Sequence, residues 1–82
     1  TKDAINKEKH GVSLTDAALI DWEAALIWQD TRQTYGETRM IALAPIRERL
    51  YCAIYVDRED NRRIISLRKA NYREVIQYAN QD

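Results

Sequence analysis

Hydrophobic and polar positions alternate with a period of two through the middle of the chain, which predicts β-strands. Residues 49–56 form one strand, with Leu50, Cys52, Ile54 and Val56 on one face and Tyr51, Ala53 and Tyr55 on the other. Residues 62–68 form another, with Ile64, Ser66 and Arg68 on one face and Arg63, Ile65 and Leu67 on the opposite face. The apolar runs 24–29 and 38–44 are two further strands. Short polar connections, the first at Pro45, indicate antiparallel hairpins among the last three strands.

Three segments outside these strands are predicted to be helical. The first, residues 1–10, ends at His10, because Gly11 can take the left-handed conformation just beyond a helix. Ser13 is a candidate N-cap for the second helix, over residues 14–22. In the third, residues 71–81, an apolar stripe at helical spacing is expected to pack on the sheet, with Tyr78 off the stripe: Tyr72, Val75, Ile76 and Ala79. The order helix, helix, four strands, helix predicts an α+β domain with an antiparallel sheet.

The length and composition of the chain fit one small globular domain. It has 82 residues, 45% hydrophobic and 32% charged. A domain of this size buries only about 60–65% of its unfolded surface, so a permanent partner would add to its stability. No apolar run approaches the roughly 20 residues of a membrane span, and no signal peptide is visible. Cys52 is the single cysteine and cannot form an internal disulfide, so we expect a cytoplasmic protein with no membrane contact.

The net charge is zero, but it is unevenly distributed. Residues 1–30 carry three basic and six acidic groups, whereas residues 58–82 carry six basic and four acidic groups. The basic side chains of residues 62–73 are Arg62, Arg63, Arg68, Lys69 and Arg73. Zero net charge argues against a protein that coats polyanions in general. A local basic patch can still hold phosphates, although such a run is also common on a solvated helix or strand edge.

Three blocks of the sequence resemble the BrnT toxin family in their order and spacing. The first is N-x-x-K-H-G-V-S at residues 6–13, followed by Ala17, and the second is G-E-T-R at residues 36–39. The third, RIISLRKANYREVIQY, matches the closing signature of the family at these positions: Arg63, Ile64, Ile65, Ser66, Arg68, Ala70, Glu74 and Tyr78. The resemblance runs from about residue 2 to residue 79. The turn in LAPIRER and a closing helix with fewer arginines depart from the family pattern.

The resemblance implies a RelE-like ribonuclease fold and the role of toxin in a type II toxin–antitoxin pair. Members of the family are metal-independent endoribonucleases that stop translation by cutting RNA. Their partner is a BrnA-type antitoxin with a ribbon-helix-helix DNA-binding domain, and operator DNA is reached only through this antitoxin. The family usually begins with a short strand ahead of the first helix. We therefore expect residues 1–82 to be a single toxin domain that lacks this strand.

RNA cleavage without a metal uses the 2′-OH as nucleophile and needs a base, an acid and cations on the transition state. Arg68 is the first candidate for the phosphate, because arginine grips phosphate oxygens in pairs, unless it forms a surface ion pair with Glu74. Arg39 either joins the site or pairs with Glu37, which is a candidate general base or a solvated charge. His10 is a candidate acid–base group, but its place at a helix end equally suits the helix dipole.

Four further residues are candidate RNA contacts: Lys9, Arg63, Lys69 and Tyr78. Because Arg63 and Arg68 are predicted on opposite strand faces, we do not expect both at one phosphate. Ser66 has no neighbouring base that would make it a nucleophile, and Cys52 is expected in the core. The spacing of Asp and Glu predicts no metal site, and no cofactor is expected. The alternative to a ribonuclease is a catalytically inactive toxin-fold module that binds an antitoxin or nucleic acid.

Overall fold

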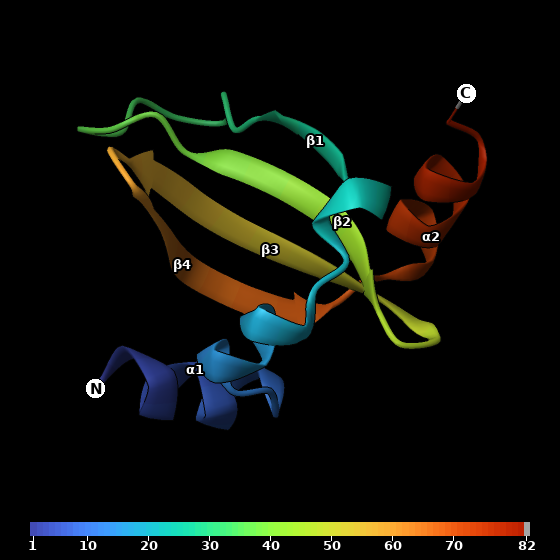
Figure 1. Ribbon diagram of the computed structural model, residues 1–82, viewed down its shortest axis with the longest axis horizontal. Helices are drawn as coiled ribbons and strands as arrows, with labels where there is room; N and C mark the ends of the chain where they lie inside the picture. The colour runs from blue at the N-terminus through green and yellow to red at the C-terminus, as the bar shows by residue number, and fades with distance from the viewer. Residues whose placement is uncertain (82) are drawn as a thin grey trace.

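One antiparallel sheet of four strands forms the centre of the molecule, with helices at both ends of the chain (Figure 1). The computed structural model describes residues 1–81. The strands lie in sequence order: β1 Leu26–Gln29, β2 Met40–Ile46, β3 Arg49–Arg58 and β4 Asn61–Lys69. Helix α1 (Lys2–His10) lies beside β4, and helix α2 (Tyr72–Ala79) follows β4. The predicted α+β class is confirmed. Neither helix of residues 1–81 has the length and apolar character that a bilayer crossing requires.

Helix α1 ends at His10, as predicted from Gly11. The backbone of Gly11 is left-handed, with φ 70° and ψ 16°, and its N–H donates to the carbonyl of Lys7 at 2.7 Å. A side chain at this position would be strained in that conformation. The last turn carries Lys7, Lys9 and His10, whose positive charges suit the negative end of the helix dipole.

Asn6 attaches α1 to the outer edge of β4. Its Nδ2 donates to the carbonyl of Leu67 at 2.8 Å and to that of Val12 at 2.7 Å, and its Oδ1 accepts the N–H of Leu67 at 3.2 Å. Asn6 is only 5% exposed. Since β4 is an edge strand, this amide takes the place of a neighbouring strand at Leu67. The position of His10 relative to the sheet follows from this contact.

The second predicted helix is instead two 3₁₀ segments, η1 (Leu14–Leu19) and η2 (Trp22–Ala24). The N-cap is confirmed, because Oγ of Ser13 accepts the N–H of Thr15 at 3.2 Å. Ala17 and Ile20 are both buried against the sheet. Ile20 has an extended backbone, with φ −65° and ψ 133°, which ends η1 and separates it from η2.

The two faces of the sheet carry separate cores, as the alternation in residues 49–56 predicted. On the helix-covered face, η1 and η2 pass over the sheet (Figure 1), and the buried residues are Val12, Ala17, Ile20, Ala42, Ala44, Ile46, Ala53, Tyr55 and Leu67. On the other face Ile41, Leu43 and Cys52 are buried, so the prediction of Cys52 in the core is confirmed. Burial raises the pKa of the Cys52 thiol to about 11.

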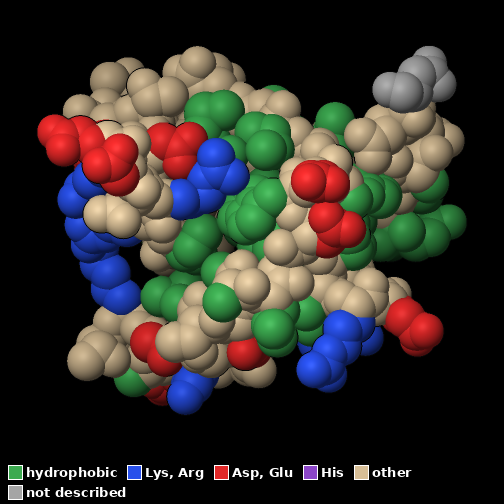
Figure 2. Space-filling model, viewed as in Figure 1, with side chains coloured by type: hydrophobic (Ala, Val, Ile, Leu, Met, Phe, Trp, Pro, Cys, Tyr) green, Lys and Arg blue, Asp and Glu red, His purple; other side chains and the backbone are tan. Residues whose placement is uncertain are grey.

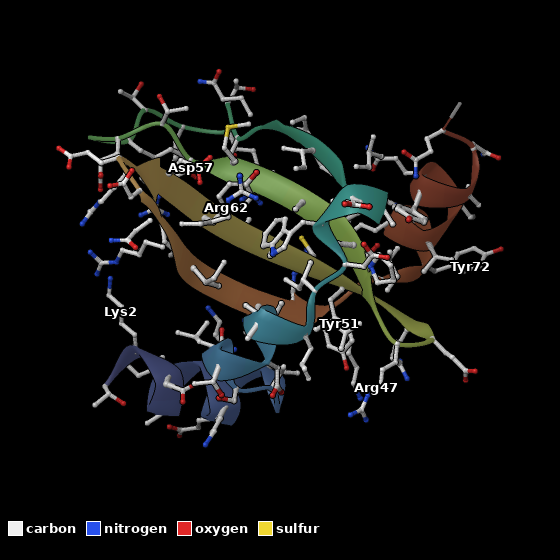
Figure 3. All side chains as sticks on the ribbon, in the orientation of Figure 1. Lys2, Arg47, Tyr51, Asp57, Arg62 and Tyr72 are labelled. Atoms are coloured by element: carbon white, nitrogen blue, oxygen red, sulfur yellow. The ribbon has the colours of Figure 1, made fainter. Side chains whose placement is uncertain are left out.

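Arg62 packs on the helix-covered face and fastens η2 to the sheet. Its guanidinium lies 4.4 Å from the ring centre of Trp22 and 4.3 Å from that of Tyr55, and these rings meet edge to face at 5.3 Å. Arg62 also pairs with Asp57 at 2.7 Å, and the two side chains lie together in Figure 3. This arginine therefore has a structural role.

Strand β2 continues through Pro45, so the predicted end of the strand at residue 44 is wrong. Pro45 pairs with Leu50, and the turn is formed by Arg47 and Glu48, with φ 56° at Arg47. Strand β1 pairs only with residues 40–43, so Pro45 lies beyond its end. The missing N–H of proline therefore interrupts no ladder on that side.

Helix α2 presents the opposite side to the sheet from the one predicted. Tyr72, Val75 and Ile76 are 79%, 45% and 42% exposed, and Figure 3 shows Tyr72 projecting away from the sheet. Tyr78 packs on the core instead, and its hydroxyl donates to the carbonyl of Ala24 at 2.5 Å. Glu74 lies one turn before Tyr78 and faces the sheet as well. Because Glu74 is charged, the side of α2 that faces the sheet does not show as a continuous apolar stripe in the sequence.

Candidate functional site

A β-bulge in β4 places Arg63 and Arg68 on the same face of the sheet. Ile54 pairs with Ser66 and Tyr55 pairs with Ile64, so Ile65 has no partner across the ladder. One extra residue reverses the alternation on one side of the bulge. The prediction that Arg63 and Arg68 lie on opposite faces is therefore wrong, as is the grouping of Ile64 with Ser66.

We call the sheet face that carries Arg39, Arg63, Ser66 and Arg68 the arginine face. A shallow groove of about 430 Å³ on this face is lined by Arg39, Ser66 and Arg68, with Ile54 and Ile65 beneath. A smaller hollow of about 180 Å³ joins Arg39 to Arg63, again beside Ile65. The predicted site residues Arg39, Arg63 and Arg68 thus surround one apolar side chain.

Arg68 is held by a bidentate ion pair with Glu74. Its Nη1 and Nη2 donate to the two carboxylate oxygens at 2.7 and 2.8 Å, and Nη1 also donates to the carbonyl of Lys69 at 3.3 Å. Oε1 of Glu74 accepts the N–H of Asn71 at 2.9 Å as part of a capping box. These hydrogen bonds lower the pKa of Glu74, with Arg68 as the main cause. Within residues 1–81, no side chain or carbonyl accepts from Nε of Arg68, so its Nε–Nη2 edge can still grip an anion.

The loop before β2 supplies Arg39 and holds it against an aromatic ring. The guanidinium of Arg39 lies 4.2 Å from the ring centre of Tyr35. The hydroxyl of Tyr35 donates to Asp30 at 3.0 Å, and Asp30 also accepts from Nε and Nη2 of Arg32, each at 2.8 Å. Asp30 is 3% exposed, and the hydrogen bonds from Arg32 hold its pKa well below the usual range. A buried carboxylate thus orders the loop that presents Arg39.

Glu37 is engaged by Arg58 rather than by Arg39. Arg58 donates to its two carboxylate oxygens at 2.9 and 2.6 Å. These hydrogen bonds lower the pKa of Glu37 below its ordinary value, and Arg63 and Arg39 act in the same direction. A carboxylate in this state accepts a proton less readily, which weakens Glu37 as a general base.

Helix α1 brings His10 and Lys9 to the edge of the arginine face. They line a hollow of about 210 Å³ together with Lys2, Ile65 and Ser66. Ile65 and Ser66 also line the groove that holds Arg68, so the two depressions adjoin each other. Figure 2 shows Lys and Arg side chains in a column at the left edge of the view, between α1 and the β3–β4 hairpin, and Figure 3 shows Lys2 extending toward that hairpin.

Two predicted contact residues lie elsewhere. Lys69 stands opposite Tyr51 in the ladder, which puts it on the helix-covered face, away from Arg68. Tyr78 is half-buried, and its hydroxyl is bonded to the carbonyl of Ala24, so its ring is part of the core and is not free to stack on a base. Among residues 1–81, no three His, Cys, Asp or Glu side chains are grouped so that they could hold a metal ion.

Sequence reasoning missed the group formed by Asp30, Arg32 and Tyr35. The sequence of this loop, DTRQTYGE at residues 30–37, is polar, and nothing in its composition distinguishes a buried carboxylate from a solvated one. One signal was available, because an Asp in a loop often accepts the backbone N–H two residues on and so closes a local turn, as Asp30 does with Arg32. From the sequence, the ion pair of Arg68 with Glu74 was predicted only as the alternative to phosphate binding by Arg68.

Comparison with known protein families identifies the family to which this chain belongs. The sequence model described as "Ribonuclease toxin, BrnT, of type II toxin-antitoxin system" matches residues 1–74. The chain belongs to the BrnT family. The resemblance in the three sequence blocks is thereby confirmed. No curated protein and no solved structure matches the chain.

Membership of the BrnT family makes this chain a ribonuclease toxin whose partner is an antitoxin. The matched region contains Arg39, Arg63, Arg68 and Glu74, so the whole arginine face lies within it. The RelE-like label stays a prediction.

The stability of this BrnT protein should depend on pH through the buried carboxylate of Asp30. Since the pKa of Asp30 is lowered on folding, its contribution is complete above the unfolded value of 3.8 and is lost as the pH falls toward the folded value. We expect Asp30→Asn to lower the free energy of unfolding by about 1–3 kcal/mol at pH 7. The difference from wild type should shrink below about pH 4.

Urea denaturation at a series of pH values measures this difference. Asp60→Asn is the matched control, because Asp60 is exposed in the β3–β4 turn, and it should change stability little at any pH. A loss for Asp30→Asn that stayed constant from pH 7 to pH 3 would contradict the role given to the ionised carboxylate.

Proposed function

We propose that this chain is a metal-independent endoribonuclease that cuts RNA on the arginine face. The observation that carries the proposal is the convergence of Arg39, Arg63 and Arg68 around Ile65, which depends on the bulge in β4. Single-stranded RNA presents its phosphates to such a groove without a need to open a duplex. Three guanidinium groups can supply the positive charge that a metal ion supplies in other nucleases.

The reaction is a transesterification within the RNA. The 2′-oxygen forms a bond to the adjacent phosphorus and passes its proton to a base, and the bond from phosphorus to the 5′-oxygen breaks. The leaving oxygen takes a proton from an acid, so the products are a 2′,3′-cyclic phosphate and a 5′-hydroxyl end. Negative charge builds up on the phosphoryl oxygens in the transition state, where the free Nε–Nη2 edge of Arg68 can bind them.

His10 is the better candidate for proton transfer in this proposal. It borders the groove through the hollow that it shares with Ser66, and it lies on a helix fixed to β4 by Asn6. Glu37 is less suited, because the pair with Arg58 lowers its pKa and occupies both its oxygens. Lys9 stands beside His10 and is placed to meet a neighbouring phosphate.

The proposed antitoxin is of the BrnA type, and operator DNA is reached only through it. The positive charge of the arginine face favours a partner whose carboxylates pair with Arg39 and Arg63. Such a partner would exclude RNA from this face. The exposed stripe of α2, seen as hydrophobic side chains at the right of Figure 2, would be covered by apolar residues of the same partner. Stoichiometric BrnA-type antitoxin should therefore stop RNA cleavage.

Incubation of the antitoxin-free protein with end-labelled RNA in EDTA tests the proposal. We expect cleavage, with cyclic-phosphate ends, and a slowing of about 10²–10⁴-fold in His10→Ala if His10 transfers a proton. Lys7→Ala is the matched control, because Lys7 lies on the same helix outside the hollow. Cleavage that needed added Mg²⁺ would refute metal independence. Intact RNA with a folded protein that binds its antitoxin would support the catalytically inactive module instead.

A further inference from the structure

The loop between β1 and β2 forms one side of a second, open hollow beside the arginine face. It has a volume of about 460 Å³, and its lining includes the uncharged polar side chains of Gln29, Gln33, Thr34 and Thr38. The carboxylates of Asp30 and Glu37 also line it, and each is paired with an arginine. Tyr35 and Arg39 line both this hollow and the groove that holds Arg68. The groove that holds Arg68 therefore adjoins a hollow rich in amides and hydroxyls.

This loop is ordered before any ligand arrives. The carboxylate of Asp30 accepts from the N–H of Arg32 at 3.1 Å, from its guanidinium and from the hydroxyl of Tyr35. The N–H of Asp30 donates to the carbonyl of Arg39 at 2.8 Å, which closes the loop at its base. A preorganised loop loses less conformational entropy when it binds, so its polar side chains can discriminate between ligands.

A stacked pair stands at the boundary between the hollow and the groove. The guanidinium of Arg39 lies over the ring of Tyr35 at 4.2 Å, and the bond to Asp30 holds that ring in place. Tyr35 and Arg39 are both half-buried, so each keeps part of its surface accessible. Aromatic rings and guanidinium planes are the surfaces on which proteins stack unpaired bases of RNA.

We propose that this hollow, the base pocket, holds the nucleobase next to the phosphate on the arginine face. Tyr35 with Arg39 is the stacking platform, and the amide of Gln33 reads the edge of the base. Amides suit this task because they present a donor and an acceptor side by side, as base edges do. A site for an acidic peptide would instead be lined mainly by cationic side chains. The inference rests on the proposed function, since it assumes RNA on the arginine face.

Binding of short RNA that cannot be cleaved tests the base pocket separately from catalysis. The probes are fluorescent hexaribonucleotides in which every 2′-hydroxyl is methylated, which removes the nucleophile, and each of a series lacks the base at one position. We expect one abasic position to weaken binding by about 5–100-fold in the wild type, the range of a base stack. In Tyr35→Leu this penalty should disappear, whereas Tyr35→Phe, which keeps the ring, should retain most of it.

Gln33→Ala should reduce discrimination among the four bases at that same position by about 5–100-fold. Gln77→Ala is the matched control, because Gln77 is an exposed amide on α2, away from the loop, and it should leave both effects unchanged. Equal affinity for every abasic probe would overturn the base pocket, and so would a penalty that survived in Tyr35→Leu. Because the probes are not cleaved, these outcomes stand whether or not intact RNA is cut, and only cleavage of intact RNA tests the ribonuclease itself.

Discussion

Arg68→Ala should lower the rate of RNA cleavage by about 10²–10³-fold, the usual effect of removing one group that stabilises transition-state charge. Arg68 is the arginine of this face whose guanidinium is held rigidly, because both oxygens of Glu74 bind it. A group that is already oriented needs no rearrangement when charge develops on the phosphate. The loss should therefore fall mainly on kcat. Single-turnover cleavage with saturating protein measures it.

Two further variants separate this effect from charge and from folding. Arg68→Lys keeps the positive charge but cannot bind Glu74 and a phosphate with two parallel pairs of hydrogen bonds, so most of the loss should remain. Arg68→Ala leaves Glu74, whose side chain is 15% exposed, without its ion pair, and this reduces stability. Arg63→Ala removes an exposed strand residue and should slow cleavage without that cost.

Arg49→Ala is the charge-matched control for these arginine variants. Arg49 is exposed beside the β2–β3 turn, in a different hollow from the arginine face. Its loss should leave cleavage within about threefold of wild type. If the Arg68→Ala and Arg63→Ala variants both cleaved RNA at the wild-type rate, the active site would lie elsewhere on the molecule.

Asn6→Ala should be the most destabilising single substitution among the polar residues, at about 3 kcal/mol or more. It removes the partners of three backbone groups, the N–H and carbonyl of Leu67 and the carbonyl of Val12. Each unsatisfied buried group costs about 1–3 kcal/mol. The total stability of a domain of this length is only about 4–12 kcal/mol. Urea denaturation gives the loss, and Glu8→Ala on the exposed side of the same helix is the control.

The consequences of Asn6→Ala should extend to the arginine face. Without the amide, α1 loses its anchor on β4, and His10 is no longer held beside Ser66. We therefore expect cleavage to fall even under conditions where the variant is folded. Hydrogen exchange should show faster exchange at the N–H of Leu67. A loss of less than about 1 kcal/mol would contradict the anchoring role of Asn6.

Local rules were sufficient for some parts of this protein. The alternation in β3 predicted both faces of the sheet, because each side chain of a regular strand follows from its neighbours. The end of α1 at Gly11 and the N-cap at Ser13 follow from the conformations that single residues allow. The three blocks of the BrnT resemblance contained Arg39, Arg63 and Arg68, so the chemistry of the site was visible as a set of residue types.

The arrangement of the site was decided only by the tertiary structure. The bulge at Ile65 brings Arg63 to the face of Arg68, and it is a property of two paired strands that the sequence of one strand does not contain. Pro45 lies within β2 because β1 is short, and α2 turns Tyr72 outward because Arg68 binds Glu74 on its inner side. Local propensity thus determined the elements and the residue types of this protein. Pairing between distant segments decided register, helix orientation and the convergence of the arginines, because those depend on contacts between residues far apart in the chain.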